Sequence, residues 1–317
     1  MATKVIAWNT GTGNITLTYG GEGNGTIVVV SDINDLSVSR SQTIKVKTLD
    51  GTIEQTLTIT QAANEPNYLT FRFTEAGTFY WKTSNASFVK SIQYRKNNGE
   101  WTTVSASTDG TVCSVDADDV IKVKGTESAY ANANYYCSFA SSGAVYVSGN
   151  VNSLINFASD FSSSNNYAFR GLLRDNAGLD IDPNKSLILP STTMRTSCYE
   201  NMFRGCTNMT LVPELPSTSL SSKCYQGMFY NCKKIESAPV LPALTLASAC
   251  YKEMFTSCSA LKYIKAMFTT TPSDTYTQNW VSGVGSGGTF VKNSAAQWDV
   301  RGRNAVPSSW TIETESA

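Results

Sequence analysis

Alternation of apolar and polar residues is the main pattern of the first 64 positions, and a period of two predicts β-strands. The runs at 43–48 and 56–60 alternate on either side of Asp50-Gly51, a dipeptide typical of tight hairpin turns. Glycines between 20 and 25 break the preceding strands. The pattern predicts a small β module over 1–64.

The same alternation continues after a polar segment at 61–66, which predicts a linker. Alternating runs flank the segment 97–100, where Asn-Gly is a strong short-range hairpin signal. Further apolar runs at 120–124 and 144–150 add strands. Together these runs predict an antiparallel β-sandwich over 65–150.

A different pattern begins near residue 151. The frame C-Y-x-x-M-F-x-x-C occurs at 198–206, 224–232 and 250–258, a spacing of 26 residues. A fixed period of this kind indicates units that each bury their apolar side against the next unit. We expect a solenoid over 151–270, with a degenerate first unit near 167–173, and a C-terminal cap over 271–317.

The recurring cysteines and phenylalanines are expected to form the core of this repeat. They are Cys198, Cys206, Cys224, Cys232, Cys250, Cys258, Phe203, Phe229 and Phe255. If the frame were helical, its two cysteines would stand about 12 Å apart along the axis, beyond disulfide reach. We therefore expect reduced, buried thiols. A bridge between Cys113 and Cys137, outside the repeats, stays open.

After the second cysteine, apolar positions three residues apart should point inward and the residues between them should face out. The residues expected inside are Met209, Val212, Leu215, Ile235, Ala238, Leu241, Leu261 and Ile264. The residues expected to face a partner from a short strand are Thr210, Glu214, Glu236, Ser237, Val240, Lys262 and Tyr263. Tyr135 and Tyr136, with Tyr130, lie in an Asn-rich loop that can stack on sugars. Core packing is the alternative for these tyrosines.

Composition excludes several chemistries. The 317 residues include equal numbers of basic and acidic side chains, 25 each, and no histidine. Zero net charge does not favour nucleic-acid binding, and Ser-His-Asp and Cys-His catalysis are impossible. Metal binding by the cysteines fails on spacing and on the missing histidine. We predict a protein that is not an enzyme and that has no catalytic, cofactor or metal site.

Two further patterns imitate ligand sites. The segment 283–288 fits G-x-G-x-x-G but lacks the strand and helix of a nucleotide fold, so we expect a loop. Aspartates at 116–119 and 175–182 lack the twelve-residue ligand loop of an EF-hand. We expect them to serve in turns and caps.

Two parts of the chain resemble known families. The closing frame of the first module, R-S-Q-T-I-K-V-K-T followed by T-L-T-I-T-Q-A, resembles the last strands of BACON-type immunoglobulin-like domains. The frame M-F-x-x-C-x-x-[LMI] with a later L-P, and the ending G-T-F-V-K-N…P-S-S-W-T-I, resemble BspA-like leucine-rich-repeat proteins of Bacteroides and its phages. This second resemblance covers roughly residues 65–312.

The resemblance implies a non-enzymatic virion surface protein of a crAss-like Bacteroides phage. This would be a capsid-attached head fibre or decoration protein, or a tail fibre component. Expected partners are other virion proteins, further copies in a homotrimer, and a host-surface glycan or protein, with 1–64 as a possible anchor. The N-terminus lacks the apolar core of a signal peptide, so we expect synthesis in the host cytoplasm, without membrane insertion. A Bacteroidetes cell-surface adhesin is the alternative.

Overall fold

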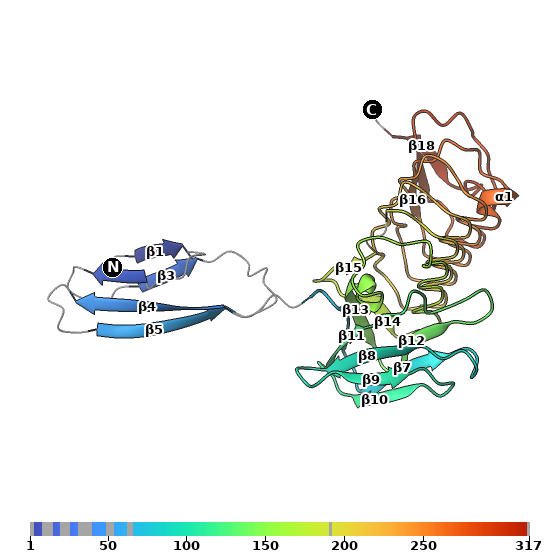
Figure 1. Ribbon diagram of the computed structural model, residues 1–317. Coiled ribbons are helices and arrows are strands. Elements are labelled where there is room, and N and C mark those ends of the chain that lie inside the picture. Colours follow the sequence, from blue (N-terminus) through green and yellow to red (C-terminus); the bar gives the residue numbers. More distant parts are fainter. Residues whose placement is uncertain are drawn as a thin grey trace. The chain divides into compact units, whose positions relative to one another are not determined.

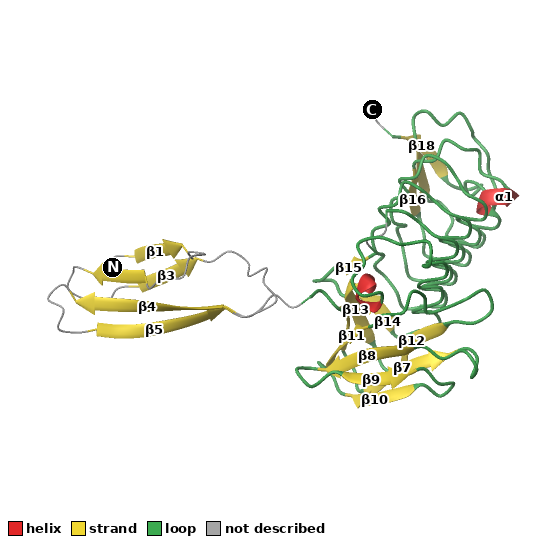
Figure 2. Cartoon of the chain, viewed as in Figure 1, coloured by secondary structure: helices red, strands yellow, loops and turns green. Residues whose placement is uncertain are grey.

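The computed structural model describes residues 66–189 and 192–315 in full and, before them, the backbone of five strands. The chain divides into two compact units, Met1–Pro66 and Asn67–Ala317 (Figure 1). The structure is mainly β with several sheets (Figure 2). Among the described residues, no helix is long and apolar enough to cross a membrane.

The first unit contains two small sheets. Their strands are β1 (Thr3–Ala7), β2 (Ile15–Tyr19), β3 (Thr26–Val30), β4 (Arg40–Thr48) and β5 (Glu54–Gln61). The predicted hairpin is confirmed, since β4 and β5 pair antiparallel with Ile44 opposite Leu57. The pairs β1–β3 and β2–β4 are parallel.

Two sheets of the second unit pack face to face. The strands are β6 (Leu69–Phe73), β7 (Gly77–Thr83), β8 (Ser91–Lys96), β9 (Thr102–Ser105), β10 (Thr111–Val115), β11 (Val120–Lys124), β12 (Cys137–Ser141) and β13 (Val145–Asn150). One sheet has the order β10-β7-β12, and the other contains β13-β6-β11-β8-β9. The ring of Phe71 on β6 lies 5.0 Å from the rings of Phe79 on β7 and Phe139 on β12. These aromatic side chains form the core between the sheets.

The turn signal of the sandwich lies at the hairpin that it predicted. β8 and β9 form the antiparallel hairpin predicted around 97–100, with Tyr94 opposite Thr102. Asn97 has a positive φ of 53° at this turn, a conformation that asparagine tolerates well. The local alternation of the sequence therefore specifies this part of the fold.

The larger sheet continues past the expected boundary at residue 150. β13 pairs antiparallel with β6 on one side. On its other side it pairs in parallel with β14 (Leu179–Ile181) and β15 (Leu187–Ile188). A short 3-10 helix (Val151–Leu154) follows β13 directly. The sandwich and the repeats thus share one sheet within a single compact unit.

The cysteine frame of each repeat is neither helix nor strand but a series of consecutive turns (Figure 2). Alternate N–H groups donate within the unit, from Glu200, Met202 and Arg204 to the carbonyls three residues before them. The N–H groups between them donate to the next unit, from Tyr199, Asn201 and Phe203 to the carbonyls of Cys224, Gln226 and Met228. The backbone of the frame is thereby paired without regular secondary structure, as burial demands.

Equivalent side chains of successive units stack in columns. Tyr199 and Tyr225 have ring centroids 6.0 Å apart with an interplanar angle of 6°. Phe203 and Phe229 lie 5.5 Å apart at 2°, and Phe229 and Phe255 lie 5.7 Å apart. The six frame cysteines are fully buried and reduced, as predicted. Cys113 and Cys137 are also reduced, so the bridge between them is not formed.

The last residues cover the end of the stack. β16 (Tyr263–Ala266), β17 (Thr289–Lys292) and β18 (Thr311–Thr314) form a parallel sheet, and the four-residue helix α1 (Asp274–Thr277) precedes Trp280. The Trp280 ring lies 6.2 Å from Tyr251 and its Nε1 donates to the carbonyl of Ala305 at 2.7 Å. The large buried ring closes the tyrosine column.

Candidate partner-binding surfaces

The inward positions of the repeat lie where the spacing predicted. Met209, Ile235 and Leu261 are fully buried, and Leu215 and Leu241 lie in the core with them. Val212 is half-buried and packs against the same core. The residues between these positions were predicted to face a partner, and all but one of them are exposed: Thr210, Glu214, Glu236, Ser237, Val240 and Lys262. Tyr263 is half-buried. The spacing therefore separated buried from exposed positions in the stacked units, with Tyr263 as the exception.

This face is less regular than the short strands predicted from the sequence. A strand, β16, forms in the repeat that begins at Cys250, whereas the equivalent segments of the repeats that begin at Cys198 and Cys224 contain no strand. Single bridges join Ser237 to Tyr263 and Leu241 to Ala266. In the repeat that begins at Cys198, Pro213 and Pro216 interrupt the segment, and proline has no N–H to donate to a sheet. The Thr210 hydroxyl instead donates to Asp180 Oδ2 at 2.6 Å.

A groove at the start of the repeats was not identified from the sequence. It has a volume of about 610 Å³ and is lined by residues 181–189, 211–214 and 216. Ile188 and Leu211 on its rim are 37% and 42% exposed, respectively. The carboxylate of Asp182 pairs with Arg72 of β6 at 3.2 Å. The groove was not predicted because its lining joins the segment that follows the start of β14 to residues 211–216 of the next repeat, which are distant in sequence.

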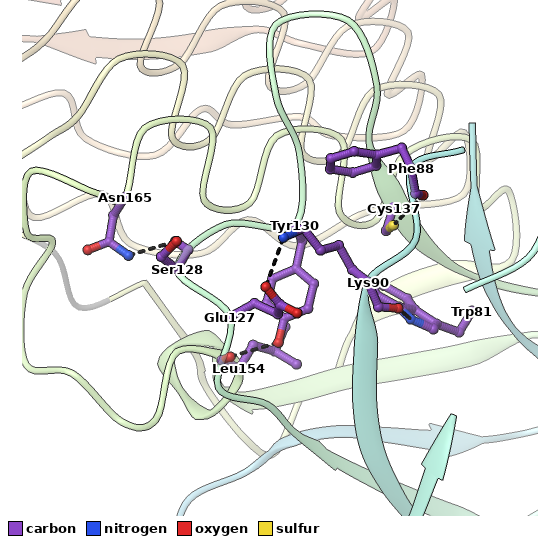
Figure 3. A network of polar contacts seen from close by, with 9 residues as sticks. All are labelled: Trp81, Phe88, Lys90, Glu127, Ser128, Tyr130, Cys137, Leu154 and Asn165. Atoms are coloured by element: carbon purple, nitrogen blue, oxygen red, sulfur yellow. Dashed lines mark hydrogen bonds and ion pairs between the residues drawn. The ribbon is translucent and has the colours of Figure 1, made fainter. Parts of the chain in front are cut away.

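Tyr130 belongs to a buried polar network rather than to a sugar-binding surface (Figure 3). Its hydroxyl donates to the carbonyl of Leu154 at 2.8 Å, and burial raises the pKa of the phenol well above its ordinary value. Nearby, Lys90 pairs with Glu127 at 2.8 Å and the Trp81 indole donates to the Lys90 carbonyl. Core packing, the alternative weighed for these tyrosines, is correct for Tyr130.

Tyr135 and Tyr136 are half-buried on the same loop. Arg174 places its guanidinium carbon 4.7 Å from the centre of the Tyr136 ring. The Tyr135 ring lies 6.2 Å from that of Phe88. Both tyrosines therefore already contact protein side chains, but neither is fully covered.

The thiols of the frame cysteines are buried and unreactive. Burial raises the pKa of Cys198, Cys206, Cys250 and Cys258 to about 12, so these groups stay protonated at neutral pH. The Cys206 and Cys258 thiols donate to the carbonyls of Leu173 and Phe229 at 3.1 and 3.0 Å. A protonated thiol is neither a nucleophile nor a metal ligand. Their arrangement favours packing.

The patterns that imitate ligand sites are structural elements. The Asp119 carboxylate accepts a hydrogen bond from the N–H of Asp116 at 2.7 Å. This bond, together with those from Lys96 and Asn97, lowers the pKa of Asp119 to about 2. The segment 283–288 is a loop of the C-terminal cap, where the Gly285 carbonyl accepts a hydrogen bond from Nε1 of Trp310 at 2.6 Å. In the described part of the chain, no group of three acidic or cysteine side chains is arranged to hold a metal ion.

Comparison with models of known protein families, with curated proteins and with solved structures finds no match to this chain.

Proposed function

We propose that this chain is a non-enzymatic virion surface protein that binds a partner through a BspA-like leucine-rich-repeat solenoid. The observation that supports the proposal best is the stacking of equivalent residues in successive units, with ring separations of 5.5–6.1 Å. Repeats stacked in register present the same exposed positions side by side, which is the surface that repeat proteins use for binding.

The exposed face suits many weak contacts rather than one deep site. It carries Glu214, Glu236 and Lys262 with Val240, and all four side chains are exposed. Exposed charges each contribute about 0.2–1 kcal/mol to a contact. Linking several copies in an oligomer would raise the overall avidity without new contacts. We therefore propose a homotrimeric head or tail fibre component, with residues 1–64 as the attachment module.

Charge reversal on this face tests the binding role. The triple variant Glu214→Lys, Glu236→Lys, Lys262→Glu should keep its melting temperature and reduce adhesion of the oligomer to host cells far more than that of a monomer. A matched control, with the same net change of charge, reverses two exposed acids and one exposed base outside the face, at Glu100, Asp109 and Arg303. Equal adhesion of both triple variants would refute the assignment of the face.

Mass spectrometry of purified phage particles tests the location. Peptides of this chain at a fixed ratio to the major capsid protein would support the virion proposal. Recovery from the bacterial outer surface in cells without phage would refute it in favour of an adhesin of the host. A chain beginning near Asn67 should fold but fail to join particles, and normal assembly of that chain would move the anchor elsewhere.

A further inference from the structure

The outer face of the larger sandwich sheet carries a row of polar and basic side chains. Ile92, Ile121 and Val123 point into the core and are buried. The residues alternating with them therefore point outward. Pairing places Lys124 of β11 opposite Gln93 of β8, and Gln93 opposite Thr103 of β9. Three neighbouring strands thus bring an amine, an amide and a hydroxyl together.

Aromatic rings border this row. The Lys124 ammonium lies 4.3 Å from the centre of the Trp101 ring, and the Arg95 guanidinium carbon lies 5.0 Å from it. The Trp101 ring lies 4.9 Å from that of Tyr68, which in turn lies 5.4 Å edge-on from Phe157. Segments from three distant parts of the sequence therefore build one aromatic cluster on this face.

A groove lies beside the cluster and has a volume of about 380 Å³. Its lining residues are Ser91, Ile92, Gln93, Thr103, Lys124, Gly125, Thr126, Ser153, Asn156 and Phe157. Phe157 is 37% exposed, and it follows Asn156 with both residues at positive φ, 55° and 56°. A bulky residue in that conformation is strained, and such strain concentrates at ligand sites. Here it holds an aromatic ring at the edge of a polar groove.

The charge of the groove is positive. The neighbouring carboxylates of Asp119 and Glu127 are already paired, with Lys96 at 2.7 Å and Lys90 at 2.8 Å. No ion pair of the described residues involves Lys124, whose contact is the Trp101 ring. The remaining polar side chains of the lining are uncharged amides and hydroxyls.

We infer that this groove binds an anionic glycan, a sugar that carries a carboxylate or a sulfate. The Lys124 ammonium pairs with the acidic group. Gln93, Thr103 and Asn156 exchange hydrogen bonds with sugar hydroxyls, and the Phe157 ring packs against the apolar face of the sugar. A nucleic acid is less well matched, because a phosphate backbone requires several cations along its path and one lysine lines this groove.

Titration of the full-length chain with small glycans tests the inference. The probes are sialyllactose, a sulfated galactose and neutral lactose, observed by saturation-transfer NMR and calorimetry at low salt. We expect both anionic probes to bind more tightly than lactose. Lys124→Gln should weaken the anionic probes about fivefold, and Phe157→Ala should weaken all sugar binding about tenfold.

Lys82→Gln is the matched control. Lys82 also lies over an aromatic ring, at 4.4 Å from the centre of Tyr80, but it belongs to β7 of the other sheet. This variant should bind all probes like the wild type. Thr103→Ala, at an exposed position, removes a groove hydroxyl with little risk to folding and should weaken binding even if Phe157→Ala unfolds.

Three results would overturn the inference. They are equal affinity for lactose and the anionic sugars, unchanged affinity in Lys124→Gln, and displacement of the sugars by a short oligothymidylate that binds more tightly. The inference extends the proposed adhesive function, but the two fail separately. A chain present in particles that binds none of these sugars refutes the glycan site alone, whereas sugar binding by a chain absent from particles refutes the virion location alone.

Discussion

Substitutions at one backbone position of the repeat should change stability in opposite directions in neighbouring units. Gly227 and Glu253 are 26 residues apart in sequence and equivalent in the frame, with φ of 59° and 56°. A side chain with a Cβ costs about 1–2 kcal/mol in this left-handed region. The greater freedom of glycine in the unfolded chain offsets about 0.4–1 kcal/mol. Glu253→Gly should therefore stabilise the chain by roughly 0.5–1 kcal/mol.

The reverse change at Gly227 should be unfavourable. A Cβ at that position would lie 2.4 Å from Asn201 Oδ1, so the amide of the preceding unit would have to rotate away. Gly227→Ala should cost about 1–2 kcal/mol. The same change at Gly205 should cost more, because its Cβ would meet both Asp175 Oδ1 at 2.4 Å and the Asp175 Cα at 3.3 Å.

Urea unfolding under reducing conditions measures these free energies, and thermal melting should follow at about 2–4 °C per kcal/mol. Gln226→Gly is the matched control, because Gln226 precedes Gly227 but has an ordinary negative φ. There glycine should destabilise by about 0.5–1 kcal/mol. If Glu253→Gly destabilises the chain as much as Gln226→Gly does, the backbone argument is wrong.

Two further predictions concern the thiols. Since the folded pKa of Cys198, Cys206, Cys250 and Cys258 is raised from 9.0 to about 12, the unfolded chain loses these protons first. Their stabilisation should be complete below about pH 9 and be lost towards pH 12, by about 1.4 kcal/mol per thiol per pH unit; an unfolding midpoint in urea that stays constant from pH 7 to 11 would contradict this. Cys224→Ser should cost about 1–3 kcal/mol by burying an unpaired hydroxyl. Cys232→Ser should cost less in the same assay, because the Cys232 thiol already donates to the Phe203 carbonyl at 3.1 Å, and equal costs would refute that role of the bond.

Much of the repeat was predictable because spacing encodes burial. Met209, Ile235 and Leu261 recur at a fixed interval, and a position that recurs beside polar residues marks the buried side of a unit. The hairpin at 97–100 was predictable for a local reason, since Asn-Gly between two alternating runs favours a tight turn, although the positive φ of this turn falls on the preceding Asn97. In both cases the determinant lies within a few residues of the structure that it specifies.

The backbone of the cysteine frame was not predictable in this way. Positive φ recurs every fourth residue, and glycine or asparagine supplies it at Asn201, Gly205, Gly227 and Asn231. Lys223, Ala249 and Glu253 adopt the same conformation without such an intrinsic preference. Hydrogen bonds to the next unit therefore impose the turn where the residue alone would not choose it. The groove beside Phe157 was missed for a related reason, because its lining comes from four separate segments.

The same hydrogen bonds explain why the stack needs special ends. Because alternate N–H groups of a frame donate to the following unit, a single unit would leave half of its turn donors unpaired. An aromatic ring at each end also covers the tyrosine column. At the start, Phe161 and Phe169 lie 5.5 and 5.8 Å from Tyr199, and at the end Trp280 lies 6.2 Å from Tyr251. Stability is therefore a property of the whole stack, and the exposed face keeps its register only while both ends are closed.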